Sequence, residues 1–104
     1  MLRPVQDTLY ILNGRWRLRI LIALFGGPLR FNQISKTMNG ITDRVLSKEL
    51  KELEQNQLIK RTVLDTFPPT IEYTVTAHGY SLEKVITAMK TWGDTHRSKI
   101  IEKK

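Results

Sequence analysis

Apolar side chains in segment 4–12 recur at intervals of three and four residues, which places them on one face of a helix. Pro4 suits the first turn of that helix, where its missing N–H is not needed, and Asn13-Gly14 ends the pattern. Apolar residues then cover most of the circumference of segment 15–25, until Gly26-Gly27-Pro28 interrupts the chain. We therefore expect an amphipathic first helix and a central, buried second helix.

Two shorter helices joined by a tight turn are predicted next. Leu29-Arg30-Phe31 is typical of a short extended segment, and a helix of about eight residues follows it. After the turn sequence Asn39-Gly40, the Thr42 hydroxyl can cap a helix over 43–55, with Asp43 at the positive end of the helix dipole. The inward faces of these two helices carry Phe31, Ile34, Met38, Leu46, Leu50 and Leu53.

The pattern changes after Leu58. Segments 59–64 and 70–75 are rich in β-branched residues and favour strands. Pro68-Pro69 between them cannot pair in a ladder, because proline donates no hydrogen bond, so we expect a hairpin with a protruding loop. Thr76 can cap a last helix with a long apolar stripe, and the tail over 100–104 is expected to fray.

The order helix, helix, short strand, helix, helix, hairpin, helix predicts a mainly α fold with a small β-hairpin wing. This is the arrangement of a winged helix-turn-helix. A chain of 104 residues suits one hydrophobic core and is too short for two. We expect a single DNA-binding domain over 1–104, with its core at about 4–95.

The charge of the chain points to a polyanionic partner. The formal net charge is +7, and 11 of the 17 basic residues precede Thr62, whereas the ten acidic residues divide evenly about that position. A basic surface of this kind attracts nucleic acid and accelerates association with it. A protein that is merely basic and soluble is the alternative.

Several other function classes are excluded or lack support. The absence of cysteine rules out disulfides, thiolate metal ligands and thiol redox switches. The longest apolar run, 20–25, is far shorter than the about 20 residues that cross a bilayer, and the first residues lack the apolar core of a signal peptide. We expect a cytoplasmic protein without membrane contact.

No site for catalysis, metal or cofactor is apparent. His78 and His96 lie 18 residues apart without carboxylates at ligand spacing, and neither a nucleophile motif nor a phosphate loop occurs. We expect neither an enzyme nor a cofactor. A pocket for a small-molecule effector near Trp16 and Trp92 stays open, although aromatic residues at such positions commonly belong to the core.

The helix over 43–55 carries the predicted DNA contacts. In a helix-turn-helix the second helix enters the major groove, with its N-terminal residues near the base edges. Arg44, Lys48 and Lys51 stand at i, i+4 and i+7, opposite the leucine face. We predict base contacts from Thr42, Arg44, Ser47 and Lys48. We predict contacts with the DNA backbone, which fix register without reading sequence, from Arg30, Lys36, Lys51, Lys60 and Arg61. The alternative is a solvated face balanced by the helix's own glutamates.

The first and last helices predict assembly. Their apolar stripes are longer than a domain this small needs for its own core. Burying both against a second copy would give a twofold dimer whose two recognition helices reach major grooves about one DNA turn apart. We predict a dimer interface formed by Val5, Leu9, Leu12, Leu82, Val85, Ile86, Met89 and Trp92. The alternative is that the last helix packs only on its own domain.

Taken together, several short motifs resemble the HxlR-type winged helix-turn-helix regulators over about residues 4 to 93. They are Leu12-Asn13-Gly14-Arg15-Trp16, Gly27-Pro28-Leu29-Arg30-Phe31-Asn32-Gln33-Ile34, Gly40-Ile41-Thr42 with Leu46-Ser47, Leu50-Lys51-Glu52-Leu53-Glu54, Pro68-Pro69 and Glu72-Tyr73-Thr74-Val75-Thr76. The resemblance implies a bacterial transcription regulator. It also implies a homodimer formed through the first and last helices, which binds an inverted-repeat operator.

Three departures limit what the resemblance implies. Arg3 stands where many members have a cysteine that some use for sensing, so thiol sensing is not carried over. Thr70 replaces a basic residue that commonly follows the Pro-Pro, so a minor-groove contact by the wing tip is not carried over either. Asn56-Gln57 replaces the glycine that usually ends the recognition helix, and we expect Asn56 to adopt the left-handed conformation there.

The leading hypothesis is thus a homodimeric transcription regulator that binds specific double-stranded DNA. A winged-helix protein-interaction module without specific DNA binding is the alternative. It would show no salt-dependent retention on DNA. The operator, the regulated genes, the sign of regulation and the effector cannot be read from the sequence.

Overall fold

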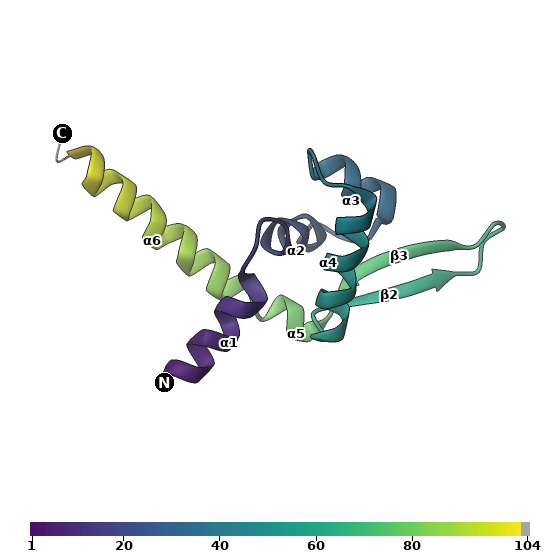
Figure 1. The fold of residues 1–104 in the computed structure, drawn as a ribbon, viewed down its shortest axis with the longest axis horizontal. Helices are drawn as coiled ribbons and strands as arrows, with labels where there is room; N and C mark the ends of the chain where they lie inside the picture. Colours follow the sequence, from purple (N-terminus) through teal and green to yellow (C-terminus); the bar gives the residue numbers. More distant parts are fainter. Residues whose placement is uncertain (103–104) are drawn as a thin grey trace.

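The helices and strands follow the predicted order, with one additional break near the C-terminal end (Figure 1). The computed structural model describes residues 1–102. The elements are α1 (Leu2–Leu12), α2 (Arg17–Phe25), β1 (Leu29–Arg30), α3 (Phe31–Thr37), α4 (Asp43–Gln55), β2 (Ile59–Leu64), β3 (Thr70–Val75), α5 (Ala77–Tyr80) and α6 (Glu83–Glu102).

The hydrophobic core lies where α2, α3, α4 and the sheet meet. Its buried side chains are Ile20, Leu21, Leu24, Ile34, Met38, Leu46, Leu50, Leu53, Leu58, Ile59 and Tyr73. Every inward residue predicted for α3 and α4 contributes, with Phe31 half-buried at the edge. Helix α2 is less enclosed than expected: it begins at Arg17 rather than Arg15, and Ile22 is 50% exposed.

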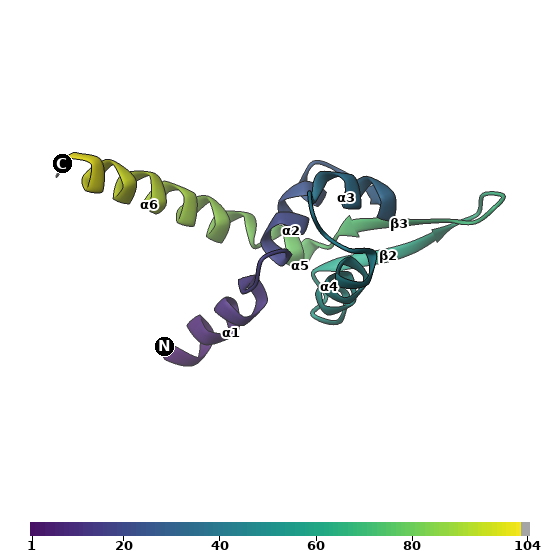
Figure 2. The same cartoon turned by 45° about the horizontal axis from the view of Figure 1, so that its top comes forward.

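A small antiparallel sheet closes the core beside α4. The strand order is β1-β3-β2, so β3 is central and the extended segment after Pro28 becomes a third strand. Tyr73 of β3 pairs with Leu29 of β1 on one side and Arg61 of β2 on the other. The β2–β3 hairpin extends beyond the helices as the wing, with its loop at the far end (Figures 1 and 2).

The end of α4 differs from the sequence expectation by one residue. Asn56 keeps a φ of −84°, and Gln57 adopts the left-handed conformation instead, at φ 61°. The Leu58 N–H then donates to the Leu53 carbonyl at 3.0 Å and the Gln57 N–H to the Glu54 carbonyl at 2.9 Å. These two bonds form a Schellman motif, which satisfies carbonyls left free at the helix end.

The predicted last helix is broken into two. Thr76 caps the short α5, where its hydroxyl accepts a hydrogen bond from the Gly79 N–H at 2.9 Å, and α6 begins only at Glu83. Leu82 therefore precedes α6 and packs against the core. Residues 100–102, for which fraying is expected from the sequence, are helical in this structure, and residues 103–104 lie outside the described part.

Helix α6 projects away from the body of the protein, on the side opposite the wing (Figures 1 and 2). The Cα radius of gyration is 16.0 Å, compared with about 13 Å for a compact chain of about 100 residues. Most of α6 therefore has no partner within the described chain. No helix among residues 1–102 combines the length and the apolar character that crossing a bilayer requires.

The left-handed conformation of Gln57 predicts a pair of opposite substitution effects. Gln57→Gly should raise the free energy of unfolding by about 1 kcal/mol, because glycine adopts positive φ without a Cβ clash. Gln55→Gly, two residues earlier in the last turn of α4, should lower it by about 0.5–1 kcal/mol. Urea denaturation at one protein concentration measures both variants. Failure of Gln57→Gly to stabilise the protein would contradict the left-handed assignment of Gln57.

Candidate nucleic-acid interface

Helix α4 turns its leucines toward the core and its basic side chains toward solvent. The three leucines are at most 2% exposed. The side chains predicted to face DNA from this helix are all exposed, namely Thr42, Arg44, Ser47, Lys48 and Lys51. The amphipathic period thus orients the predicted recognition face outward, and the helix boundaries match those expected from the sequence.

The leading end of α4 is fixed by its N-cap. The Thr42 hydroxyl accepts a hydrogen bond from the Val45 N–H at 3.2 Å, which confirms the predicted cap. Asp43 follows in the first turn, where a negative charge is favourable. This cap sets where the helix starts, and Arg44 emerges in its first turn.

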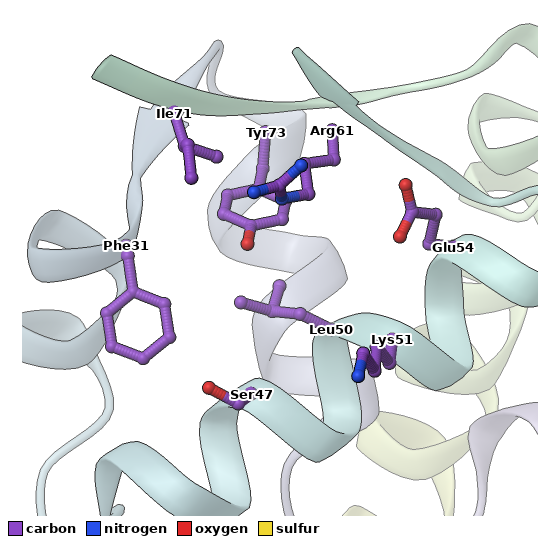
Figure 3. A pocket seen from close by; sticks show the side chains of 8 residues that line it. All are labelled: Phe31, Ser47, Leu50, Lys51, Glu54, Arg61, Ile71 and Tyr73. Carbon is purple, nitrogen blue, oxygen red and sulfur yellow. The ribbon is translucent and has the colours of Figure 1, made fainter. Parts of the chain in front are cut away.

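A hollow of about 520 Å³ lies between α4 and the base of the wing (Figure 3). Ser47, Lys51 and Glu54 contribute from α4, while Arg61 projects from β2 on the opposite wall. The rest of the lining is aromatic or aliphatic and comprises Phe31, Leu50, Ile71 and Tyr73. The fold therefore brings Lys51 and Arg61, predicted separately as backbone contacts, to a shared site.

Tyr73 is a candidate that sequence reasoning missed. Its side chain is 8% exposed, and its hydroxyl points into the hollow toward α4 (Figure 3). In the sequence it stands within a β-branched segment, which predicts a strand residue and no more. The strand period placed it on the same face as Ile71, but what that face meets depends on the packing of α4.

The other predicted backbone contacts are exposed but lie apart from the hollow. Arg30 ends β1, where its N–H donates to the Gln33 side chain at 2.8 Å, and Lys36 lies in the last turn of α3. Lys60 precedes Arg61 on β2 and therefore points to the other face of the sheet. The structure thus brings Arg61, but not Lys60, beside α4.

The wing tip offers no positive charge. Residues 62–70 contain Asp65 and no basic residue. The Thr66 hydroxyl donates to the Pro68 carbonyl at 2.8 Å and lies 2.8 Å from the Thr70 hydroxyl, while the Phe67 side chain is fully exposed. The cationic part of the wing is its base, beside α4.

The basic side chains that face solvent on α4 form no ion pair within residues 1–102. Within residues 1–102, the ion pairs involve Arg17 and Lys90 as the basic partners. The hydrogen bond that Lys90 donates to Asp94 on α6, together with the carboxylate charge, raises the pKa of Lys90. In this described range no three acidic or histidine side chains cluster as they would to hold a metal ion.

A second surface is apolar and lies on α1 and α6. Of the predicted dimer residues, five are exposed: Val5, Leu9, Val85, Met89 and Trp92. A groove of about 650 Å³ is lined from both helices, with Leu9 and Leu12 on one side and Val85 and Met89 on the other. Leu12 and Leu82 pack partly on the chain's own core, and Ile86 is half-buried. The fold thus joins the two predicted stripes into one surface.

A sequence profile described as HxlR-like helix-turn-helix matches residues 11–101. The chain belongs to this family. A relative from Bacillus subtilis (strain 168), the uncharacterized HTH-type transcriptional regulator YdeP, is 41% identical over 97 residues, which are 93% of this chain and 76% of the relative. Membership of this family confirms the expected function of DNA binding in transcription regulation.

Solved structures of similar chains share the fold of this protein. A transcriptional regulator of the MarR family from Enterococcus faecalis V583 superimposes with a TM-score of 0.88 at 34% identity, covering 93% of this chain and 88% of the other. The reduced form of the regulator YodB from B. subtilis gives 0.82 at 37% identity, covering 86% and 87%. YodB has also been solved in a quinone-bound form.

The cap at the start of the recognition helix predicts a measurable loss. Thr42→Ala should lower the free energy of unfolding by about 1 kcal/mol, because the Val45 N–H loses its acceptor. Thr42→Ser keeps a hydroxyl at the same position and should retain most of that stability. Urea denaturation compares the three proteins, and equal stability of the alanine and serine variants would refute the role of the cap.

Proposed function

We propose that the protein is a homodimeric regulator that inserts α4 of each copy into successive major grooves of an inverted-repeat operator. The observation that supports this most directly is the outward face of α4. Its basic side chains are exposed and free of internal ion pairs within residues 1–102, while its leucines lie in the core. A rigidly held helix of this kind can present side chains to base edges.

The roles of the individual side chains follow from their chemistry and place. Thr42, Arg44, Ser47 and Lys48 occupy the leading half of α4 and are proposed to contact bases. Arginine can donate two hydrogen bonds to the O6 and N7 atoms of guanine, so Arg44 is the main candidate for sequence readout. Lysine is a flexible point charge and suits phosphate as well as base.

The hollow beside the wing base suits a DNA phosphate. Lys51 and Arg61 supply positive charge from its two walls, and the Tyr73 hydroxyl is placed to donate a hydrogen bond into it. Glu54 at the rim leaves the site with a net charge near +1. Arg30, Lys36 and Lys60 are proposed as further backbone contacts, while the wing tip, lacking basic residues, contributes little.

The apolar surface on α1 and α6 supports pairing with a second copy. Its five exposed apolar residues come from both helices, and all of them except Trp92 line one groove. Removing apolar area from water is favourable by about 25 cal/mol per Å² before the entropy cost of association, so covering such a surface is favoured. A twofold axis through this surface would give two copies of α4 the symmetry of an inverted repeat.

Regulation by a small molecule is consistent with the family. The quinone-bound form of YodB supports an effector for a relative, and we infer that this chain also has one. Because the sequence contains no cysteine, any effector must act without a thiol of this chain. Since the proposed ligand is chromosomal DNA, the protein is proposed to act in the cytoplasm.

Selection from random DNA with the purified protein tests the proposed recognition. We expect an inverted repeat in the recovered sequences, with one base position per half-site assigned to Arg44. Arg44→Ala should relax the preference at that position and cost about 1–3 kcal/mol of specific binding. Recovery of unrelated sequences by the wild-type protein would refute specific DNA binding. An unchanged preference at every position with Arg44→Ala would refute the role of Arg44.

Lys51→Ala serves as the matched test of a backbone contact. It should weaken all DNA sequences similarly and reduce the slope of log K against log salt by about one unit. The control is Lys99→Ala, which removes the same charge from the exposed α6. Equal salt slopes for the two variants would contradict a phosphate contact at Lys51.

The dimer surface predicts a change in oligomeric state. Trp92 is 68% exposed on α6, and Trp92→Ala should raise the dimer dissociation constant by about tenfold or more, because buried tryptophans dominate interface energies. Phe67→Ala provides the control, since Phe67 is equally apolar and fully exposed but lies at the wing tip. Sedimentation equilibrium measures both, and equal effects would argue against the α1–α6 surface.

A further inference from the structure

One side chain, Arg17, connects three helices. It is the first residue of α2, yet its side chain is only 15% exposed. Its Nε donates to Glu49 Oε2 on α4 at 2.8 Å, and its Nη1 donates to the Tyr10 carbonyl on α1 at 2.9 Å. Its Nη2 also lies 4.0 Å from Glu52 Oε2. The guanidinium thus lies between the end of α1 and the middle of α4.

The contact with α1 matters because little else holds this helix to the body. No residue of α1 is fully buried, and only Ile11 and Leu12 pack partly on the core. Tyr10 lies in the last turn, where carbonyl groups lack helical partners and carry partial negative charge. Arg17 satisfies one of these carbonyls, and its guanidinium carbon lies 5.4 Å from the centre of the Tyr10 ring.

The contact with α4 is a hydrogen-bonded ion pair between Arg17 and Glu49. A hydrogen bond between an arginine and a carboxylate is charge-assisted, and the planar guanidinium fixes the direction of each bond. The Glu49 side chain is itself only 16% exposed, so solvent screens this pair less than a surface pair. One rigid group therefore sets the position of α1 relative to α4.

We propose that Arg17 is a positioning residue that fixes the angle between the pairing helix and the recognition helix, and thereby selects the spacing between operator half-sites. The inference rests on the proposed dimeric function. Val5 and Leu9 on α1 belong to the surface proposed to meet the second copy. A rotation of α1 against the body would therefore displace the partner's recognition helix relative to this one, and the half-site separation would follow.

The test measures the spacing preference of the full chain. Selected half-sites are joined as inverted repeats with spacers of increasing length, and affinity for each is compared with affinity for a single half-site. The wild type should prefer one spacing. Arg17→Gln should broaden the profile and reduce the affinity for the preferred repeat by about tenfold, while changing the single half-site affinity by about twofold or less.

Matched variants separate positioning from charge and from folding. Arg17→Lys keeps the positive charge but loses the planar guanidinium, so its spacing profile should be intermediate. Glu49→Gln changes the net charge in the opposite direction from Arg17→Gln, yet it should also broaden the spacing profile. Arg19→Gln is the control, because it removes the same charge from the same helix. The guanidinium carbon of Arg19 lies over the Trp16 ring, 5.7 Å from its centre. Thermal unfolding and sedimentation establish that each variant is folded and dimeric. If Arg17→Gln does not fold, the lysine variant carries the same test.

The outcomes distinguish the two proposals. A sharp spacing preference that the wild type and Arg17→Gln share would overturn the role of Arg17 and leave the dimeric function intact. An equal loss on single and paired half-sites would also overturn it, because it would show only a damaged recognition helix. A wild type with no preference between spacings would refute the dimeric function, and the role of Arg17 with it.

Discussion

The burial of one face of α4 is the constraint on which the proposed DNA-binding side of this protein depends. Leu46, Leu50 and Leu53 are fixed in the core by contact with α2, α3 and the sheet. Each fully buried leucine contributes about 1.5–3 kcal/mol relative to an exposed one. Because these residues recur with the helical period, their burial forces the polar residues between them outward. The direction of the proposed recognition face is therefore set by the hydrophobic core, before any DNA is present.

The sequence predicted the elements well where local signals were strong. The bounds of α4, β2 and β3 agree with the expectation, because Thr42 caps the helix and Pro68-Pro69 separates two β-branched segments. Local signals were weaker at the ends of helices. Gln57, rather than Asn56, adopts positive φ, although asparagine tolerates that conformation better.

The sequence could not predict which side chains meet across the fold. Arg17 and Glu49 are separated by 32 residues, and their contact depends on how α2 crosses α4. The convergence of Lys51, Arg61 and Tyr73 likewise requires the sheet to lie beside the recognition helix. Periodicity gives the face of each residue within its own element. The partner on the neighbouring element follows only from packing. Lys51 and Arg61 were therefore predicted singly, while Tyr73 and the hollow that joins the three were not predicted.

The projection of α6 has a thermodynamic consequence. Its exposed apolar side chains contribute little to the stability of an isolated chain, because they remain in water whether the chain is folded or not. Any molecule that covers them binds only the folded form, and so shifts the unfolding equilibrium by mass action. At a free concentration of about 100 times its dissociation constant the shift is about 2.7 kcal/mol, a large share of the 5–15 kcal/mol typical of a domain. With a second copy as the proposed partner, the melting temperature of this protein should rise with its own concentration.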